Sequence, residues 1–257
     1  MRTVSRLAVA PVKGMALLHP DEIVLERYGV AENRRFHVID DDGRRYGQTR
    51  NGTLVRIVPE YDADADRLAL RFPAGELVSA KVALGEPVTT DFYGRPVRGR
   101  IVEGPWADAI SAYAGRPLRL VKTDEPGGGV DRALGPVSML SDASLDELAR
   151  NTERDGVDAR RFRMLIGVAG CAPHEEDEWL GRLVRVGEAL VRLHEQVARC
   201  AITTQNPETG VPNFDTLREI ARYRGTRDED GKYIDFGVFG EVAEPGRVRI
   251  GDPVEPQ

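Results

Sequence analysis

The sequence predicts an α+β fold dominated by β-strands and arranged as two β-rich domains. Short segments with partial apolar–polar alternation, separated by Gly, Pro, Asp or Asn, fill residues 1 to about 120. The second part of the chain adds a few helical patterns between further strand-like segments. A length of 257 residues corresponds to one or two domains of ~150 residues. We therefore expect a β-barrel-like domain over 1–120 and a second domain over 121–257.

Six strand-like segments lie in the first domain. Regular short strands with little helix favour a small barrel or a curled sheet. The tripeptide Asp41-Asp42-Gly43 is typical of a hairpin turn. The segments read VSRLAVAPVK, DEIVLERYGV, RRFHVIDDDGRRY, TLVRIVPEYD, DRLALRF and RPVRGRIV.

The second domain begins with a turn-rich stretch, TDEPGGGVDRALGP, over 123–136. Its three consecutive glycines lack the strand-to-helix context of a phosphate-binding P-loop, so we expect a surface loop. A capping-box pattern at Ser144 predicts a helix start, and a second helix is expected from Asp215. The strand-like segments read RFRMLIGV, LVRVGEALVRLHEQ, YIDFGVFGEV and RVRIGDPVE.

Composition excludes several classes of protein. Hydrophobic residues make up 41% of the chain and charged residues 30%, which excludes a disordered chain. A net charge of −6 argues against a nucleic-acid partner, so any anionic ligand needs a local basic cluster. No apolar run approaches the ~20 residues of a membrane helix. Pro11 and Lys13 interrupt the N-terminal apolar patch, which therefore reads as a first strand rather than a signal peptide. We expect a cytoplasmic protein with no nucleic-acid or membrane partner.

Cys200 is the main candidate for chemistry. It follows Arg199 at the expected end of a strand, and a polar turn comes after it. A nearby cation favours the thiolate, which is the form that binds metals or attacks electrophiles. An inert buried cysteine is equally compatible with this pattern alone. Two cysteines are too few for a disulfide scaffold or an iron–sulfur cluster, and we expect Cys171 to be a packing residue.

Two histidine-containing segments are weaker candidates for chemistry. A regular strand would place His194 on the same face as Cys200, where it could deliver protons, although a structural histidine is the commoner role. The run His174-Glu-Glu-Asp-Glu178 could suggest a hard-cation site. A charge run usually forms a solvated surface, and that is what we expect here.

The segment ARCAITTQNPETG resembles the signature of the MOSC family, named for the C-terminal part of molybdenum-cofactor sulfurases. LSDASLDEL, RRFRMLIGVAG followed by EEDEW, and GDPV resemble further motifs of that domain. APVKG and ENRRFHVIDDDG resemble the N-terminal β-barrel domain that accompanies it. The resemblance covers nearly the whole chain and is nearest to the amidoxime-reducing branch.

The resemblance implies a molybdenum cofactor, a molybdopterin whose nucleotide form it does not specify. Cys200 would be the catalytic residue and the molybdenum ligand, in keeping with the affinity of soft metals for thiolates. Ser141 and Ser144 would lie at a helix N-terminus, where free N–H groups attract anions. The implied cofactor-binding residues are Lys13, Arg34, Ser141, Ser144, Arg163, Arg199, Thr203 and Thr204.

The chain departs from the family pattern at two points. Gly14 follows Lys13 where the family commonly has Ser, and Met164-Leu165 follow Arg163 where it has Pro-Asn. These changes remove two polar groups that the resemblance places near the cofactor.

The implied function is the reduction of N-hydroxylated compounds, such as amidoximes and hydroxylamines, by an oxidoreductase. With only two cysteines the chain has no ferredoxin domain, so a separate electron-transfer protein is expected. One alternative is a sulfur carrier with a persulfide at Cys200; it would need an external sulfur source because no pyridoxal-phosphate-dependent portion is recognised. Another is a non-catalytic module that binds the cofactor or a different anionic ligand.

Overall fold

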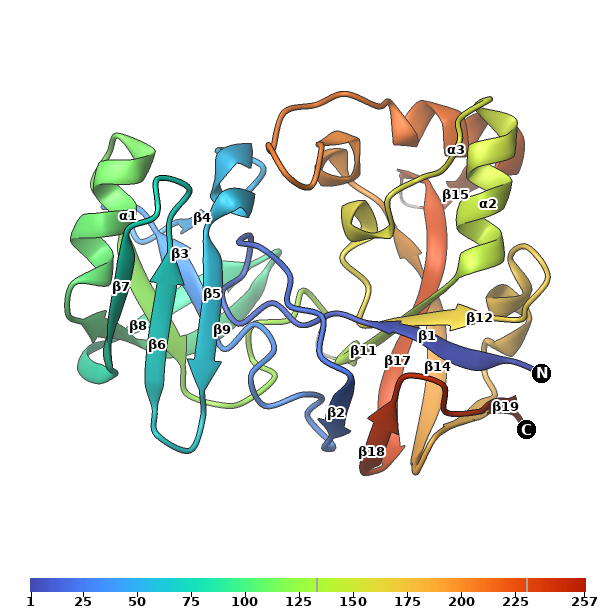
Figure 1. Cartoon of the computed structure of the whole chain (residues 1–257), viewed down its shortest axis with the longest axis horizontal. Helices are drawn as coiled ribbons and strands as arrows, with labels where there is room; N and C mark the ends of the chain where they lie inside the picture. Colours follow the sequence, from blue (N-terminus) through green and yellow to red (C-terminus); the bar gives the residue numbers. More distant parts are fainter. Residues whose placement is uncertain (133, 230) are drawn as a thin grey trace.

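The computed structural model describes residues 1–132, 134–229 and 231–257, which form two β-rich halves lying side by side (Figure 1). In the first half, five strands form a sheet in the order β4-β3-β10-β9-β8, and three strands form a second sheet in the order β5-β6-β7. The strands are β3 (Phe36–Ile39), β4 (Arg45–Tyr46), β5 (Val58–Asp62), β6 (Arg67–Arg71), β7 (Leu77–Lys81), β8 (Ala83–Phe92), β9 (Arg95–Glu103) and β10 (Arg119–Thr123).

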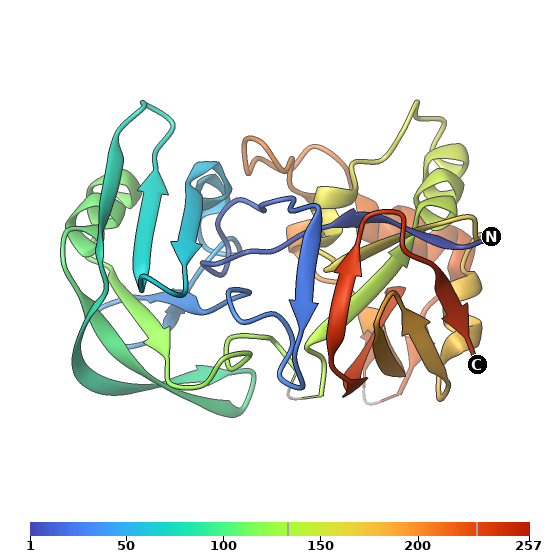
Figure 2. The same ribbon diagram turned by 60° about the horizontal axis from the view of Figure 1, so that its bottom comes forward.

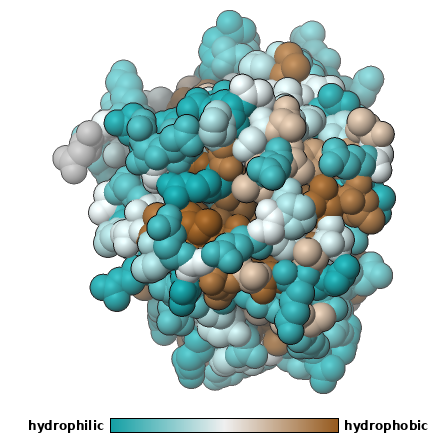
Figure 3. Space-filling model, turned by 90° about the vertical axis from the view of Figure 1, so that its left-hand side faces the viewer, coloured by the Kyte–Doolittle hydropathy of each residue, from teal (hydrophilic) through white to brown (hydrophobic). Residues whose placement is uncertain are grey.

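One α-helix and one 3₁₀-helix complete this half: α1 (Trp106–Ala114) and η1 (Gly52–Arg56). Trp106 and Ile110 on α1 are fully buried and belong to the same hydrophobic cluster as Phe36 and Leu68. Burial of large apolar side chains is what stabilises this half. Figure 3 views the molecule from the end that carries α1 and β7, where hydrophobic residues gather in the middle and hydrophilic residues surround them.

The second half is built on a seven-stranded sheet in the order β1-β12-β11-β17-β14-β13-β19. An isolated bridge joins Thr3 in β1 to Pro253 beside β19, so the two ends of the strand order meet and the sheet is nearly a closed barrel. The strands are β1 (Thr3–Leu7), β11 (Val137–Ser141), β12 (Ile166–Ala169), β13 (Leu183–Val186), β14 (Ala189–Ala198), β17 (Asp235–Glu244) and β19 (Val254–Pro256).

Short helices cover part of this barrel. Leu148 on α2 (Asp142–Asn151) and Ile220 on α3 (Thr216–Arg224) are fully buried in the same hydrophobic cluster as Phe236 of β17. The remaining elements are α2 (Asp142–Asn151), α3 (Thr216–Arg224), η2 (Ala159–Phe162), η3 (Glu175–Trp179), η4 (Ala201–Thr204), β2 (Glu22–Leu25), β15 (Arg227–Asp228), β16 (Lys232–Tyr233) and β18 (Gly246–Arg249).

The beginning of the chain belongs to the second half. β1 pairs with β12, and β2 pairs with β18 near the C-terminus, so both termini lie at the same end of the molecule (Figures 1 and 2). The chain then crosses into the first half and returns after β10. The expected division near residue 120 falls inside β10 and stays a prediction. In the described part of the chain, every helix is too short or too polar to cross a membrane.

The β-dominated fold and the hairpin turn at Asp41-Asp42-Gly43 are confirmed, since β3 and β4 pair on either side of that turn. Helix α1 and strands β7 and β8 were not predicted. The expected helix start at Ser144 is wrong by one turn, because Ser141 is the N-cap and accepts a hydrogen bond from the Ser144 N–H. The acidic run is not a solvated face: Glu176 is fully buried within η3.

Candidate functional site

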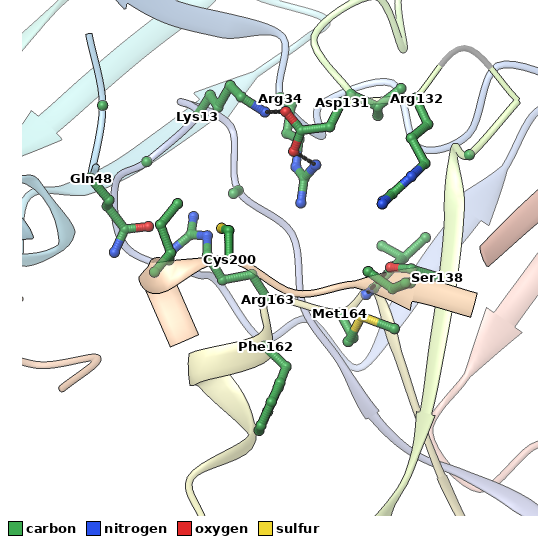
Figure 4. Close-up of a pocket in the computed structure, with 18 of the residues that line it drawn as sticks. Lys13, Arg34, Gln48, Asp131, Arg132, Ser138, Phe162, Arg163, Met164 and Cys200 are labelled. Carbon is green, nitrogen blue, oxygen red and sulfur yellow. Dashed lines mark hydrogen bonds and ion pairs between the residues drawn. The ribbon is translucent and has the colours of Figure 1, made fainter. Parts of the chain in front are cut away.

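A pocket opens between the two halves of the molecule (Figure 4). Its wall combines the segment that follows β1, the loop between β10 and β11, the end of η2 and the start of η4. Cys200, Arg163 and Met164 line it from the second half, and Gln48 lines it from the first (Figure 4). The site is thus assembled from segments that are far apart in sequence.

Cys200 is an exposed free thiol at the N-cap of η4. The Thr203 N–H and Thr203 Oγ each lie 3.1 Å from the Cys200 carbonyl oxygen and donate hydrogen bonds to it, which fixes the turn. Strand β14 ends two residues earlier, after register shifts near Leu193 and Gln196. These irregularities break the alternation expected for this strand, and His194 instead faces Glu241, 3.3 Å away, outside the described pocket lining.

Three cations surround one carboxylate on the opposite wall. The Asp131 carboxylate lies 2.7 Å from Lys13 Nζ, 3.3 Å from Arg34 Nη1 and 3.6 Å from Arg45 Nη1. Burial lowers the pKa of Lys13 to about 7; Asp131 opposes this effect, and the neighbouring Arg34 and Arg45 add to it. Burial acts to raise the pKa of Asp131, but Lys13 and Arg34 hold it well below its usual range.

Two further arginines line the pocket and have no carboxylate partner among the described ion pairs. Arg163 Nη2 donates to the Met15 carbonyl oxygen at 2.8 Å, and Arg199 Nε donates to the Phe236 carbonyl oxygen at 2.7 Å. Burial lowers the pKa of Arg163 to about 9, and the positive charge of Arg34 adds to this effect. Burial likewise lowers the pKa of Arg199 to about 9. An excess of buried positive charge favours an anionic ligand.

Backbone strain gathers at this pocket. Arg34, Tyr93 and Arg163 all line it and all have positive φ, at 55°, 57° and 52°. Side chains larger than glycine adopt this region at a cost of order 1–3 kcal/mol each. Such strain clusters at ligand-binding sites, where the surrounding structure holds a side chain in a useful position.

The residues expected from the sequence divide into two groups. Lys13, Arg34, Arg163, Arg199, Thr203 and Cys200 line the pocket. Arg163 is not in the expected strand; it is the C-cap of η2. Thr204 does not line the described pocket, and its hydroxyl donates to the Ala201 carbonyl oxygen at 2.7 Å.

Ser141 and Ser144 are also outside the described pocket lining. Both are fully buried around the Glu176 carboxylate, which accepts hydrogen bonds from Ser144 Oγ at 2.7 Å and from the Ser141 N–H at 3.2 Å. The Ser144 hydroxyl in turn accepts from the His174 N–H at 2.9 Å. The hydrogen bonds described for both serines thus go to groups of the protein itself, and their expected role in cofactor binding stays a prediction that these contacts do not support.

Sequence reasoning missed Asp131, Arg132, Arg45 and Gln48, which line the same pocket. Asp131 and Arg132 lie in the turn-rich stretch expected to be only a surface loop; residue 133 of that stretch is outside the described residues. The loop approaches the site because Gly129 packs on Arg34, where an added Cβ would lie 1.9 Å from the Arg34 carbonyl oxygen. The three consecutive glycines of this stretch are the sequence feature that indicates such a close backbone approach.

The two departures from the family pattern have a local explanation. Gly14 has φ +86°, a conformation that a serine side chain would strain, and an added Cβ would meet the Gln48 backbone N–H at 3.4 Å. Met164 Sδ accepts a hydrogen bond from Arg199 Nη2 at 2.9 Å. The Leu165 N–H donates to Ser138 Oγ at 3.0 Å, and Ser138 also lines the pocket. The pocket thus keeps polar groups from other positions, Gln48 and Ser138 (Figure 4).

Comparisons with known proteins cover nearly the whole chain. Residues 127–255 match the family model described as MOSC domain, and residues 1–112 match the one described as MOSC N-terminal beta barrel domain. Mitochondrial amidoxime-reducing component 1 of Mus musculus is 26% identical over 98% of this chain and 81% of its own length. A molybdenum cofactor sulfurase of Drosophila grimshawi is 27% identical over 97% of this chain and 34% of its own length.

Among solved structures, the YuaD protein from Bacillus subtilis covers 100% of this chain and 97% of its own, with a TM-score of 0.47 and 12% identity. The two family models together span both halves of the molecule. The chain therefore belongs to the MOSC-domain family and carries the N-terminal β-barrel domain found with it.

Proposed function

We propose that the pocket binds molybdenum cofactor and that the protein reduces N-hydroxylated compounds with electrons from a separate protein. The observation that carries this proposal is an exposed free thiol, Cys200, in a pocket with an excess of positive charge. The relatives named for amidoxime reduction support it, at 26% identity over nearly the whole chain.

The residues present fit such a cofactor. Thiolates are suitable ligands for soft and thiophilic metals, and Cys200 would supply such a ligand from an extended backbone at the start of η4. Within the described residues there is no cluster of three or more His, Cys, Asp or Glu side chains for a metal. Cys200 is accordingly the proposed single protein ligand.

The phosphate of the cofactor requires donors and positive charge. Arg163 and Arg199 are proposed to provide both, because backbone carbonyl oxygens already orient their guanidinium groups. Lys13 and Arg34 are proposed to supply further charge from the facing wall, and Gln48 offers an amide. Gln48 Oε1 is buried and accepts no hydrogen bond from the described residues, as expected for an atom that awaits a ligand.

When bound, the cofactor supplies the two electrons that cleave an N–O bond. The chain itself would orient the substrate near Cys200 and control protons, since release of water and an amine or amidine consumes two of them. Lys13 Nζ is the proposed proton-exchanging atom, because its pKa of about 7 matches neutral pH. Its ion pair with Asp131 holds that nitrogen on the pocket wall.

The test is to express the protein in a host that synthesises molybdenum cofactor and to measure molybdenum, pterin and benzamidoxime reduction by a reduced dye. We expect near-stoichiometric molybdenum and pterin together with conversion of benzamidoxime to benzamidine. Well-folded protein that contains neither molybdenum nor pterin would contradict the proposal.

Sulfur transfer is the second candidate, favoured by the exposure of the Cys200 thiol and by the similarity to a molybdenum cofactor sulfurase. Cyanide-labile sulfur on Cys200 without benzamidoxime reduction would favour it. Bound cofactor with neither activity would instead indicate a carrier module.

A further inference from the structure

An aromatic residue occupies a turn that favours a small polar one. Tyr93 and Gly94 form the two-residue connection between β8 and β9, and Phe92 pairs with Arg95 on either side of it. Both turn residues have positive φ, at 57° and 85°. Hairpin turns of this kind strongly prefer Asn-Gly, so a tyrosine in the first position is unfavourable for the turn itself. Because the turn does not favour tyrosine, we look for a function of the Tyr93 side chain itself.

The Tyr93 side chain lies at the pocket. Tyr93 lines it, although 67% of the residue is exposed. The guanidinium of Arg45 lies 4.1 Å from the centre of the Tyr93 ring and 4.8 Å from that of Phe92. Arg45 is itself fixed 3.6 Å from the Asp131 carboxylate. The ring is therefore held in place by a cation–π contact on one side while much of its surface stays accessible.

Cys200 and Tyr93 line the same pocket, one from each half of the molecule. Partial burial raises the pKa of Tyr93, and the negative charge of Asp131 raises it further, while Arg45 opposes both effects. The phenol is accordingly neutral at physiological pH and can donate a hydrogen bond. A ligand near the Cys200 thiol thus meets a flat apolar surface with a polar tip.

We propose that Tyr93 determines specificity by stacking on a flat aromatic group of the substrate while the N-hydroxylated group faces Cys200. This inference rests on the proposed function and names its preferred substrate class: aromatic amidoximes and arylhydroxylamines rather than small aliphatic ones. The surface on which the substrate stacks is thus the Tyr93 ring, which the β8–β9 turn contributes from the first half of the chain.

The experiment compares benzamidoxime with acetamidoxime in the cofactor-loaded protein and measures benzamidoxime binding by calorimetry. Tyr93→Asn removes the ring and installs the residue that this turn prefers, so its melting temperature should be equal or higher. We expect the ratio of the two kcat/KM values to fall roughly tenfold, mainly through KM, and benzamidoxime binding to weaken by a similar factor. Tyr93→Phe should keep the preference.

Tyr233→Ala is the matched control, because the Arg227 guanidinium lies 4.9 Å from the centre of its ring and it is outside the described pocket lining. It should leave the ratio unchanged. An unchanged ratio in Tyr93→Asn, or equal losses on both substrates, would overturn the assignment of Tyr93. If the unaltered protein reduces neither amidoxime, the proposed function fails, and the binding measurement alone decides the role of Tyr93.

Discussion

The ammonium group of Lys13 lies 2.7 Å from the carboxylate of Asp131, and this ion pair joins the segment after β1 to the loop between β10 and β11. Only part of the positive charge on this wall is neutralised, because Arg34 and Arg45 approach the same carboxylate. The ion pair therefore affects both the net positive charge of this wall and the pH range over which Lys13 is charged and can bind an anion.

Anion binding should weaken as pH rises through neutrality. Lys13 has a pKa lowered to about 7, so its ammonium is charged at pH 6 and mostly neutral at pH 8. We expect the affinity for sulfate, measured by calorimetry, to fall about tenfold over this range. Lys13→Arg stays charged and should reduce that pH dependence. An equally steep decline in Lys13→Arg would show that another group controls it.

Asp131→Asn should strengthen sulfate binding, by up to about tenfold at pH 5–6, because the carboxylate competes with the anion for Lys13 and the arginines. At pH 7 the gain should be smaller, since loss of Asp131 also lowers the pKa of Lys13. The melting temperature should fall by about 2–4 °C, as three cations lose their shared counter-charge. Asp124→Asn is the control, since Asp124 is exposed in the same loop. Weaker sulfate binding by Asp131→Asn would mean that the carboxylate organises the site rather than competing for it.

Ser144→Ala should destabilise the protein without changing cofactor content per folded molecule. It removes the 2.7 Å hydrogen bond to the buried Glu176 carboxylate, which should lower the free energy of unfolding by about 1.5–3 kcal/mol. Ser5→Ala is a suitable control, because Ser5 Oγ is buried and has no hydrogen-bond partner among the described residues. A loss of pterin with stability unchanged would return Ser144 to the cofactor site.

Arg163→Ala should weaken pterin retention, measured as pterin per protein after extensive dialysis. Arg163 lines the pocket and is oriented by the Met15 carbonyl oxygen, so the variant loses a positioned cation. Arg160→Ala provides a matched comparison, since Arg160 lies one turn earlier and pairs with Asp158 outside the described lining. Equal pterin occupancy in both variants and in the unaltered protein would make Arg163 a structural residue.

Local patterns predicted much of the fold. Partial alternation located β2, β3, β6 and β9, a strand-like segment located β17, and the Asp215 cap located α3, because these signals depend on neighbouring residues. Local patterns could not predict that β1 pairs with β12 or that β2 pairs with β18, since strands that pair in a sheet can come from opposite ends of a chain. Helix α1 was missed because it is short and only Trp106 and Ile110 are buried, so the helical period is marked by a single pair of apolar residues.

The candidate site was predictable where a motif carried it. Cys200, Lys13 and Arg34 were found because each lies in a segment that resembles the MOSC family, and all three line one pocket. Asp131 and Arg45 carry no such motif; their role follows from which side chains the two halves bring together. Ser144 shows why a helix-start motif alone is ambiguous, because a polar residue there can also bind the protein's own buried carboxylate.

The most direct test of the central claim is the molybdenum content of Cys200→Ser, purified from a host that synthesises the cofactor. Cys171→Ser is the control, because Cys171 packs against the hydrophobic core of the barrel instead of lining the described pocket. We predict that Cys200→Ser folds with an unchanged melting temperature but loses molybdenum, whereas Cys171→Ser retains it. Stoichiometric molybdenum in folded Cys200→Ser would contradict the assignment of Cys200 as the metal ligand.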